Sequence, residues 1–558
     1  MSSTKLFVNG RIFTSRPGDE SLHQAMLVEG DKVMCVGTNE HVIQKASQAG
    51  SSTEKIDLNG SVVLPGIVDG HTHLVMLGAA LNRINTIGLS IGQIQTALSD
   101  ARKAEPNVKK LLGRSFLFNA LGKPPHRKHL DEVVRDIPVF IDSADLHSCW
   151  LNTAALNVLG ITKDTPDPKG GSFEKDTDGE LTGLFLETAV VDHVWPYLAA
   201  QLTDEKRLQY LDDVFKSYLA TGVTGATEMA LEGLDLAALE TIYNRNGGKL
   251  PIRISCHWIV SPNGSAEDRA ERVMEAVKHK ERLASHAPWL RIAGIKIIAD
   301  GVVDSCTAYC SKAYHDGTFA KPIWPREELL ETVALADKHG LQVAVHAIGD
   351  AAIDMALDAF EYAINVNGER PKGARLHRIE HLEVVTRESI IRLAKLGVVA
   401  SLQPVHADPI YVPNWRKMLS EDERCDRAFP WSEYVEADAL MAFGSDAPTA
   451  PHHCFPNIYT ATTRQSGLDA SHPPSTDERI KSLSRFCVGL EKATQNYTLG
   501  SAYSCQSSAY CGSLEPGKSA DFCILEIDPF KNGLETLREA QEGVRETWLC
   551  GERVWSKV

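Results

Sequence analysis

The chain has 558 residues and a formal net charge of −15, from 58 basic and 73 acidic side chains. This balance, without a local basic patch, opposes binding to nucleic acid phosphates and to anionic membrane surfaces. Apolar residues make up 43% and charged residues 23%, as in ordinary soluble proteins, and no apolar run could span a bilayer. The N-terminus lacks a signal sequence, so we expect the cytoplasm. Twelve cysteines without metal-finger spacing predict reduced, mostly buried thiols.

Both ends of the chain predict short β-strands joined by turns that contain glycine. The segments with this pattern are residues 6–15, 25–37, 519–530 and 546–555. We therefore expect one composite β-sandwich domain, formed from residues 1–63 and 495–558. The central domain would then cover residues 64–494.

The central domain alternates strand-like apolar runs with segments of helical periodicity. Eight strand-like runs cover residues 62–68, 222–229, 251–258, 291–298, 341–350, 374–381, 397–404 and 439–446. Between two of them, residues 325–340 carry apolar side chains at helical spacing and end in glycine, as a helix does before its next strand. This order predicts an α/β fold, a (β/α)8 TIM-type barrel.

One interval of the central domain is too long for a single crossover helix. Between His73 and Gly222 lie 148 residues that are rich in glycine, proline and polar clusters. We expect these residues, about 75–221, to form a large insertion after the first barrel strand, over the barrel mouth. The sequence shows no solenoid repeat or low-complexity tract.

Two histidines, His71 and His73, directly follow the first predicted barrel strand. Alternate residues of a strand face the same side, so both imidazoles can bind one metal ion. In a barrel the chemistry takes place at the carboxyl ends of the strands, and further side chains of metal-binding type recur there. They are Lys296 in the fourth strand, His346 in the fifth, His381 in the sixth and Asp446 after the eighth. This convergence predicts a metal site.

Each of these residues also has an ordinary structural explanation. A single histidine is more often a core or surface residue than a metal ligand. Lys296 could pair with Asp300 or Asp304, and Asp446 could cap the helix that follows it. The joint placement of six such residues at one rim makes these separate explanations much less satisfactory.

The predicted ligand set contains no thiolate, which argues for an open, catalytic metal site. Four histidines and one aspartate also exceed what a closed structural zinc site needs. An ammonium has no lone pair to donate, so Lys296 could bind a metal only after carboxylation to a carbamate. A carbamate could bridge two ions.

These motifs resemble the amidohydrolase superfamily, and specifically its branch related to N-substituted formamide deformylases (amidohydrolase family 3 type). The resemblance covers nearly the whole chain, in several long segments in the same order. They are LPGIVDGHTHL (64–74), LHSCWLNTAAL (146–156), GELTGLFLETA (179–189), GIKIIADG (294–301), VAVHAIGDAAID (343–354), RIEHLE (378–383), ASLQPVH (400–406) and FGSDAP (443–448).

The resemblance implies two divalent metal ions, most simply zinc, each with its own ligands. These would be His71, His73 and Asp446 for the first ion, His346 and His381 for the second, and carboxylated Lys296 between them. Glu187 from the insertion could offer a carboxylate in place of Lys296. Asp446 would also act as the catalytic proton shuttle.

Four further residues would line the substrate pocket by this resemblance. They are His147, Trp150, His406 and Asp350. Trp150 could instead be ordinary core, and Asp350 could orient His346 or cap a helix.

The reaction that the resemblance implies is hydrolysis of a linear C–N amide bond, in an N-substituted formamide or an N-acyl amide. A divalent metal lowers the pKa of bound water from about 15.7 to about 7, so hydroxide is available at neutral pH. Asp446 would accept that proton and deliver it to the departing nitrogen. We therefore expect a small-molecule amide as partner, with neither nucleic acid nor membrane, and leave a homodimer open.

Two other functions stay open. A deaminase, or a hydrolase of cyclic amides or lactones, could use the same barrel, although a mononuclear deaminase does not require a bridging Lys296. A non-catalytic scaffold barrel belongs to another class. It would have no need of the intact histidines and Asp446.

Overall fold

The computed structural model describes residues 4–48, 53–118, 120–143, 148–168, 171–371, 373–540 and 543–557, apart from the side chains of Glu187 and Val191. The chain divides into two compact units. The first contains Met1–Leu74 and Phe215–Val558, and the second contains Val75–Val214. Over the described residues, no helix combines the length and the apolar content that a membrane crossing requires.

The first unit is built around eight parallel strands that follow one another in chain order in one sheet. They are β8 (Ile67–Thr72), β15 (Val223–Leu231), β16 (Arg253–Ile259), β17 (Leu290–Ile298), β18 (Gln342–Ala347), β19 (Arg378–His381), β20 (Val399–Leu402) and β21 (Leu440–Phe443). A parallel bridge between Thr72, the last residue of β8, and Ala447, which follows β21, brings the sheet close to closure. The structure confirms the predicted (β/α)8 barrel.

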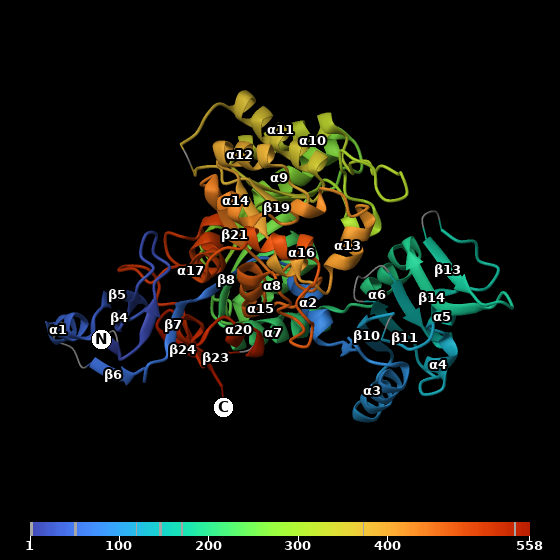
Figure 1. The fold of residues 1–558 in the computed structure, drawn as a ribbon, viewed down its shortest axis with the longest axis horizontal. Helices are drawn as coiled ribbons and strands as arrows, with labels where there is room; N and C mark the ends of the chain where they lie inside the picture. Colours follow the sequence, from blue (N-terminus) through green and yellow to red (C-terminus); the bar gives the residue numbers. More distant parts are fainter. Residues whose placement is uncertain are drawn as a thin grey trace. The chain divides into compact units, whose positions relative to one another are not determined.

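Helices connect the barrel strands and cover them from outside. They are α8 (Gly233–Arg245), α9 (Ala266–Arg282), α10 (Arg326–Lys338), α11 (Asp350–Asn367), α12 (Arg387–Leu396), α13 (Val412–Met418) and α14 (Trp431–Glu436). The helix predicted over residues 325–340 is α10, which buries Leu329, Val333 and Ala336 on one face. It packs beside α11 (Figure 1).

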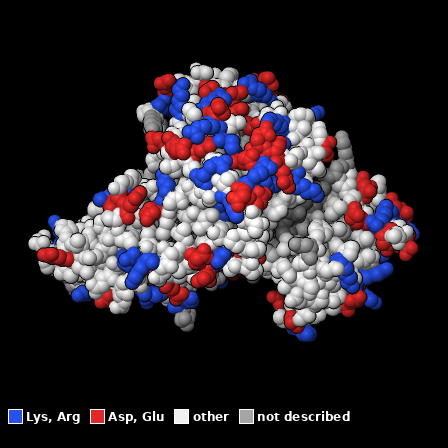
Figure 2. Space-filling model, viewed as in Figure 1, with Lys and Arg blue, Asp and Glu red and all other residues white. Residues whose placement is uncertain are grey.

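The outer faces of these helices carry charges of both signs, which are interspersed on the side that Figure 2 shows. Arg392 of α12, for example, pairs with Asp358 and Glu361 of α11 at 2.7 and 2.6 Å. Exposed ion pairs of this kind stabilise a fold by less than about 1 kcal/mol each. Burial of the apolar helix faces therefore contributes more to holding the helices on the barrel than these pairs do.

The run predicted as the first barrel strand is in fact two strands. β7 (Val62–Pro65) belongs to a sheet of the chain termini, and the barrel strand β8 begins only at Ile67. Gly66 separates them, and a Cβ there would lie 2.1 Å from the hydroxyl oxygen of Thr224. Both strands are buried on both faces, so the continuous apolar pattern concealed the change of sheet.

The strands near the two ends of the chain form two sheets, of which the first is entirely N-terminal and the second combines both ends. The strand order of the first sheet is β5 (Lys32–Gly37), β4 (Ala25–Glu29), β1 (Thr4–Val8) and β6 (Thr53–Asp57). The strand order of the second sheet is β24 (Glu552–Ser556), β23 (Val544–Leu549), β22 (Phe522–Leu525), β7, β2 (Arg11–Phe13) and β3 (Leu22–His23). Their core includes Phe7, Phe522 and Trp548, with ring centroids 5.2 to 5.4 Å apart. Figure 1 shows the blue N-terminal strands beside the red β23 and β24. This confirms the composite β domain.

The segment before the C-terminal strands is helical. It contains α15 (Cys454–Thr463), α16 (Glu478–Ser482), α17 (Leu490–Gln495), the π-helical turn η7 (Asn496–Gly500) and α18 (Ser501–Ser504), while α19 (Pro529–Asn532) and α20 (Glu535–Glu539) follow β22. The Tyr497 hydroxyl donates to the Gly444 carbonyl at 3.0 Å, and the Ser501 hydroxyl to the Phe443 carbonyl at 2.7 Å. These helices thus hold the last barrel strand. We propose that the second part of the β domain begins after them, later than residue 495.

The second unit has its own six-stranded sheet, in the order β13 (Gly171–Lys175), β14 (Leu181–Glu187), β12 (Ser148–Leu151), β11 (Val139–Ser143), β10 (Leu111–Phe116), β9 (Ile84–Asn85). Its helices are α3 (Ile91–Ala104), α4 (Arg127–Asp131), α5 (Thr153–Leu159), η1 (Val190–Val194) and α6 (Trp195–Ala200), and α2 (Leu74–Leu81) and α7 (Asp204–Ala220) connect it to the barrel strands. Ile94 and Leu98 of α3 share a core with Trp150. The predicted large insertion is confirmed as an α/β unit with its own core.

Candidate metal centre

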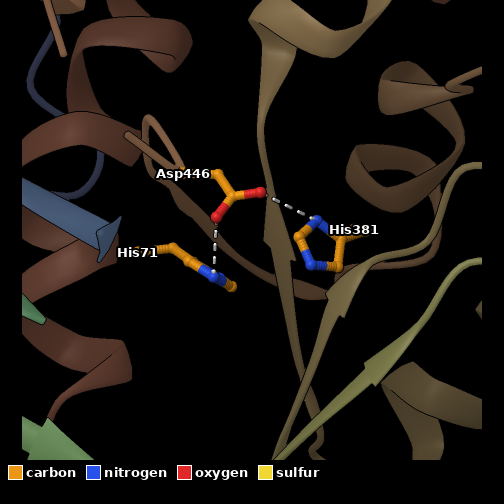
Figure 3. Close-up of side chains that lie close together, drawn as sticks. All are labelled: His71, His381 and Asp446. Carbon is orange, nitrogen blue, oxygen red and sulfur yellow. Dashed lines mark ion pairs between the residues drawn. The ribbon is translucent and has the colours of Figure 1, made fainter. Parts of the chain in front are cut away.

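A buried carboxylate, Asp446, lies among the predicted metal ligands. Its Oδ1 is 3.2 Å from Nε2 of His71 and 3.2 Å from Nε2 of His73, and its Oδ2 is 4.0 Å from Nδ1 of His381. Figure 3 shows the carboxylate between the rings of His71 and His381. Ligand atoms of these two histidines and Asp446 all lie within 4.8 Å of one another, so one metal ion can reach all three.

Two of these residues have an unusual backbone conformation. His381, the last residue of β19, has φ 77°, and Asp446, in the loop after β21, has φ 54°. Residues other than glycine rarely adopt this left-handed conformation, and those that do cluster at functional sites. The conformation turns both side chains toward the centre at the ends of their strands.

Asp69, a second buried carboxylate, joins the first barrel strand to the loop after the last. It accepts hydrogen bonds from the backbone N–H of His71 at 3.2 Å and from the backbone N–H and hydroxyl of Ser445 at 2.9 and 2.6 Å. Because Ser445 precedes Asp446, these bonds position the Asp446 carboxylate opposite His71. Burial raises the pKa of Asp69. Sequence analysis missed it, although Asp69 alternates with His71 and so faces the same side.

Glu380 orients His71. Its Oε2 accepts a hydrogen bond from Nδ1 of His71 at 2.7 Å, and Arg378 donates to both carboxylate oxygens at 2.5 and 3.0 Å. Burial opposes ionisation of Glu380, but the Arg378 charge outweighs it and holds the pKa of Glu380 well below its usual range. Glu380 thus holds the Nδ1 side of His71, and Nε2 is the nitrogen that faces Asp446 and would be available to a metal, as in metal-bound histidines.

The protonation states of the centre suit a divalent metal ion. Burial opposes ionisation of Asp446, but the charge of His71 and hydrogen bonds from His71 and His73 hold its pKa well below the usual value. Burial and the neighbouring His346 lower the pKa of His381, which is therefore neutral. Its Nδ1 is buried and accepts no hydrogen bond among the described residues. A carboxylate beside the unprotonated imidazole of His381 fits the ligand chemistry of zinc and related ions.

Lys296 lies near the same centre, on β17, and is 2% exposed. Burial lowers the pKa of its amine to about 8, although the Glu380 and Asp446 carboxylates oppose the shift. A lowered pKa leaves part of the amine uncharged near neutral pH, the form that can react with carbon dioxide. Burial of Lys296 therefore fits the predicted carboxylation.

His346 on β18 packs against His381, with ring centroids 4.4 Å apart, but is not in the three-residue ligand set. Its Nε2 is 3.6 Å from Asp300, and burial lowers its pKa to about 3. Asp350, which we considered for orienting His346, instead starts α11 and accepts a hydrogen bond from the Ser311 backbone at 2.8 Å. The carboxylate beside His346 is Asp300, which corrects that interpretation of Asp350.

The other predicted residues have different surroundings. His406 lies at the centre, with Nε2 3.6 Å from Oδ2 of Asp446. Trp150 is fully buried in the core of the second unit, and its role in substrate binding stays a prediction. His147 and the side chain of Glu187 lie outside the described residues.

Three buried glutamates around the centre were missed by sequence analysis: Glu228, Glu380 and Glu383. Strand alternation places a glutamate directly before His381 on the opposite face from it. The left-handed φ of His381, 77°, and of Leu382, 56°, breaks this alternation. The sequence did hold a signal for two of them, because the short segment RIEHLE (378–383) places Glu380 and Glu383 on either side of His381.

The fold and these side chains define a barrel protein with a group of residues at the carboxyl ends of its strands that could hold a divalent metal ion. Sequence comparison assigns it further: the model of the amidohydrolase family (Amidohydro_3) matches residues 54–555. The chain belongs to this family of hydrolases, which confirms the resemblance in its motifs.

Three relatives match over almost their whole length. The putative amidohydrolase YtcJ of Bacillus subtilis is 30% identical, over 95% of this chain and 98% of its own. The N-substituted formamide deformylase of Arthrobacter pascens is 27% identical, over 95% and 94%. An uncharacterized metal-dependent hydrolase from Pyrococcus horikoshii has a similar solved structure, with a TM-score of 0.74, 27% identity and coverage of 96% and 99%.

Proposed function

We propose that this chain hydrolyses a linear C–N amide bond, in an N-substituted formamide or an N-acyl amide. The observation that carries the proposal is the buried Asp446 carboxylate, held 3.2 Å from Nε2 of both His71 and His73. Similarity to an N-substituted formamide deformylase supports the type of bond. Amide hydrolysis needs an activated water and a proton donor for the departing nitrogen.

When bound at this centre, a divalent metal would lower the pKa of a water molecule and polarise the substrate carbonyl. Asp446, ionised in the resting site, takes the proton that the attacking water loses. The same carboxyl group then gives the proton to the nitrogen as the C–N bond breaks. Glu380 orients His71 through Nδ1, so that Nε2 faces the centre, and Asp69 holds the loop that carries Asp446.

Zinc is the metal that we propose, with two ions per chain and a carboxylated Lys296 as one ligand. The nitrogen and oxygen ligands without thiolate, and the buried amine with pKa about 8, support these choices. Mass spectrometry of the intact protein, prepared with bicarbonate, should show one added carbon dioxide that is absent after Lys296→Ala. An unmodified wild-type mass together with unchanged zinc content in Lys296→Ala would contradict the proposal.

The reaction is tested with a panel of N-substituted formamides, longer N-acyl amides and cyclic amides, using zinc-loaded protein. We expect linear amides to be hydrolysed and Asp446→Asn to lower kcat by about 10²- to 10⁴-fold, the usual contribution of a general acid–base group. Asp438→Asn is the matched control, because Asp438 has nearly the same backbone conformation (φ 53°) but is exposed. Full activity of Asp446→Asn would refute the assigned role.

A second candidate is a deaminase or a hydrolase of ring amides or lactones with one metal ion. The observation in its favour is that His71, His381 and Asp446 form one compact set able to surround a single ion. Clear preference for a ring substrate, with one ion per active chain, would establish this candidate over the first.

A further inference from the structure

A thiol, a thioether and an imidazole come together on the segments that follow β17 and β20. Sγ of Cys306 lies 3.5 Å from Sδ of Met418 and 3.9 Å from Nδ1 of His315. Cys306 follows the short 3-10 helix η3 (Val303–Ser305), and Met418 is the last residue of α13. None of the three residues belongs to the predicted ligands of the metal centre or has a part in the proposed reaction.

The backbone brings these three side chains together. Cys306 has a left-handed φ of 57°, which residues other than glycine rarely adopt, and its N–H donates to the Val303 carbonyl at 2.9 Å. The backbone N–H of His315 donates to the Met418 carbonyl, also at 2.9 Å. The imidazole and the thioether therefore start from neighbouring points of the backbone, and the turn at Cys306 brings its thiol to both.

A side-chain hydrogen bond fastens η3 to α13 beside the three residues. Nδ2 of Asn414 donates to Oδ1 of Asp304 at 3.0 Å. Asn414 and Met418 are four residues apart on α13 and share one face of that helix, while Asp304 is two residues before Cys306. This bond therefore holds the thiol against the thioether. Cys306 and Met418 are partly buried and His315 is exposed, so an ion can approach from solvent.

The spacing of the ligand atoms suits a metal ion with three ligands. Nitrogen and sulfur ligands bind a metal such as zinc at about 2.0 to 2.3 Å, so three of them in one plane with the ion would stand roughly 3.5 to 4.0 Å apart. The two separations from Sγ of Cys306, 3.5 and 3.9 Å, lie in this range. An ion bound to Cys306 could therefore reach Met418 and His315 with little movement of either side chain.

The types of ligand decide which metal fits. Thiolate and thioether sulfurs are soft ligands that favour Cu(I), whereas zinc takes cysteine, histidine and carboxylate ligands, usually four in a structural site. We propose that Cys306, Met418 and His315 form a binding site for one Cu(I) ion, which shares no residue with the candidate metal centre. Binding converts the thiol to a thiolate and releases one proton, so the thiolate and the ion together carry no net charge. This inference does not depend on the proposed hydrolysis.

Competition for Cu(I) tests the site independently of activity. The full, zinc-loaded chain is reduced, kept without oxygen and titrated against the coloured Cu(I) complex of bathocuproine disulfonate, which loses colour as the protein takes the ion. The variants are Cys306→Ser, Met418→Leu and His315→Asn. Cys487→Ser is the matched control, because Cys487 is also a partly buried thiol of the same unit. Circular dichroism establishes that each variant is folded, and Met418→Leu, which conserves volume, serves if Cys306→Ser fails to fold.

We expect the wild type and Cys487→Ser to bind one Cu(I) per chain with equal affinity and to keep their zinc. Loss of a partner that only supports a ligand costs about 10- to 100-fold in metal affinity, so Cys306→Ser should lose more than about 100-fold, and Met418→Leu and His315→Asn at least about 10-fold. X-ray absorption at the copper edge should show two sulfur neighbours and one nitrogen.

Wild-type affinity for Cu(I) in folded Cys306→Ser or Met418→Leu would overturn the proposal. Release of one zinc for each copper bound would show that copper enters the metal centre instead, and would overturn it equally. Zinc bound at Cys306 as tightly as Cu(I) would refute the choice of metal.

Discussion

His257, a buried residue of β16, makes the stability of the barrel depend on pH. Its Nε2 donates to the side-chain oxygen of Gln342 at 2.9 Å, and that side chain donates in turn to the Ser504 carbonyl at 2.7 Å. Nδ1 of His257 is buried and bonded to no described residue. Protonation would therefore place an unsatisfied N–H in the core, near the Arg378 charge. Burial and this charge lower the pKa of His257 to about 3.

The unfolded chain binds this proton near pH 6.5, whereas the folded chain binds it only near pH 3. Stability from His257 is therefore complete above pH 6.5 and is lost as the pH falls toward 3, by about 1.4 kcal/mol per pH unit. Urea unfolding of His257→Gln between pH 4 and 8 should show a shallower pH dependence than the wild type. The exposed His41→Gln is the control. Equal slopes for all three proteins would contradict the prediction.

At the scale of elements, Gly66 makes the change from the terminal sheet to the barrel possible. Its backbone N–H donates to the Asp521 carbonyl at 2.8 Å, and Thr224 of β15 fills the space where a side chain would be. Gly66→Ala should therefore destabilise the protein by about 1 to 3 kcal/mol, the usual cost of inserting a methyl group into a packed core.

Denaturant unfolding measures this change, with Gly92→Ala as the matched control. Gly92 lies in α3, and a Cβ there meets nothing within 4 Å. That substitution should stabilise the helix by about 0.5 to 1 kcal/mol, because alanine is the better helix former. A Gly66→Ala protein as stable as the wild type would show that the strand junction is not tightly packed.

The sequence predicted the barrel strands best where a run of apolar residues ends in a polar residue. The strand ends that carry His71, Lys296, His346 and His381 followed from apolar runs and their polar last residues. The presence of both Glu380 and His381 at the centre did not, because alternation puts them on opposite faces and His381 reaches the centre through its left-handed φ. Alternation is a property of regular strands, and this site begins where the strand stops being regular.

At the scale of the whole molecule, a buried ion pair joins the barrel to the C-terminal strands. Arg253 of β16 bonds to both Asp521, just before β22, and the Ser519 hydroxyl, the latter at 2.9 Å. Asp521 also accepts from the backbone N–H of Cys550 at 2.8 Å. The Asp521 charge raises the pKa of Arg253 despite burial, so the guanidinium stays charged.

Asp521→Asn should therefore cost about 3 to 5 kcal/mol, because it leaves a buried charge without its partner. Since the β domain and the barrel belong to one unit, we expect one transition at a lower Tm, with faster hydrogen exchange in β16 and β22 alike. Glu526→Gln removes the exposed pair with Lys557 in the same region and should change Tm little. Early loss of β22 alone would contradict this coupling.

The sequence by itself determined the barrel, the composite β domain, the insertion, the family and the residue types that meet at the strand ends. These follow from periodicity and from motifs, which depend on neighbours along the chain. The tertiary structure decided which imidazole nitrogens face Asp446, that Glu380 and Glu383 hold two of them, and that Asp300 and not Asp350 lies beside His346. Such pairings join residues far apart in sequence, and hydrogen-bond direction exists only once the strands are closed into a barrel.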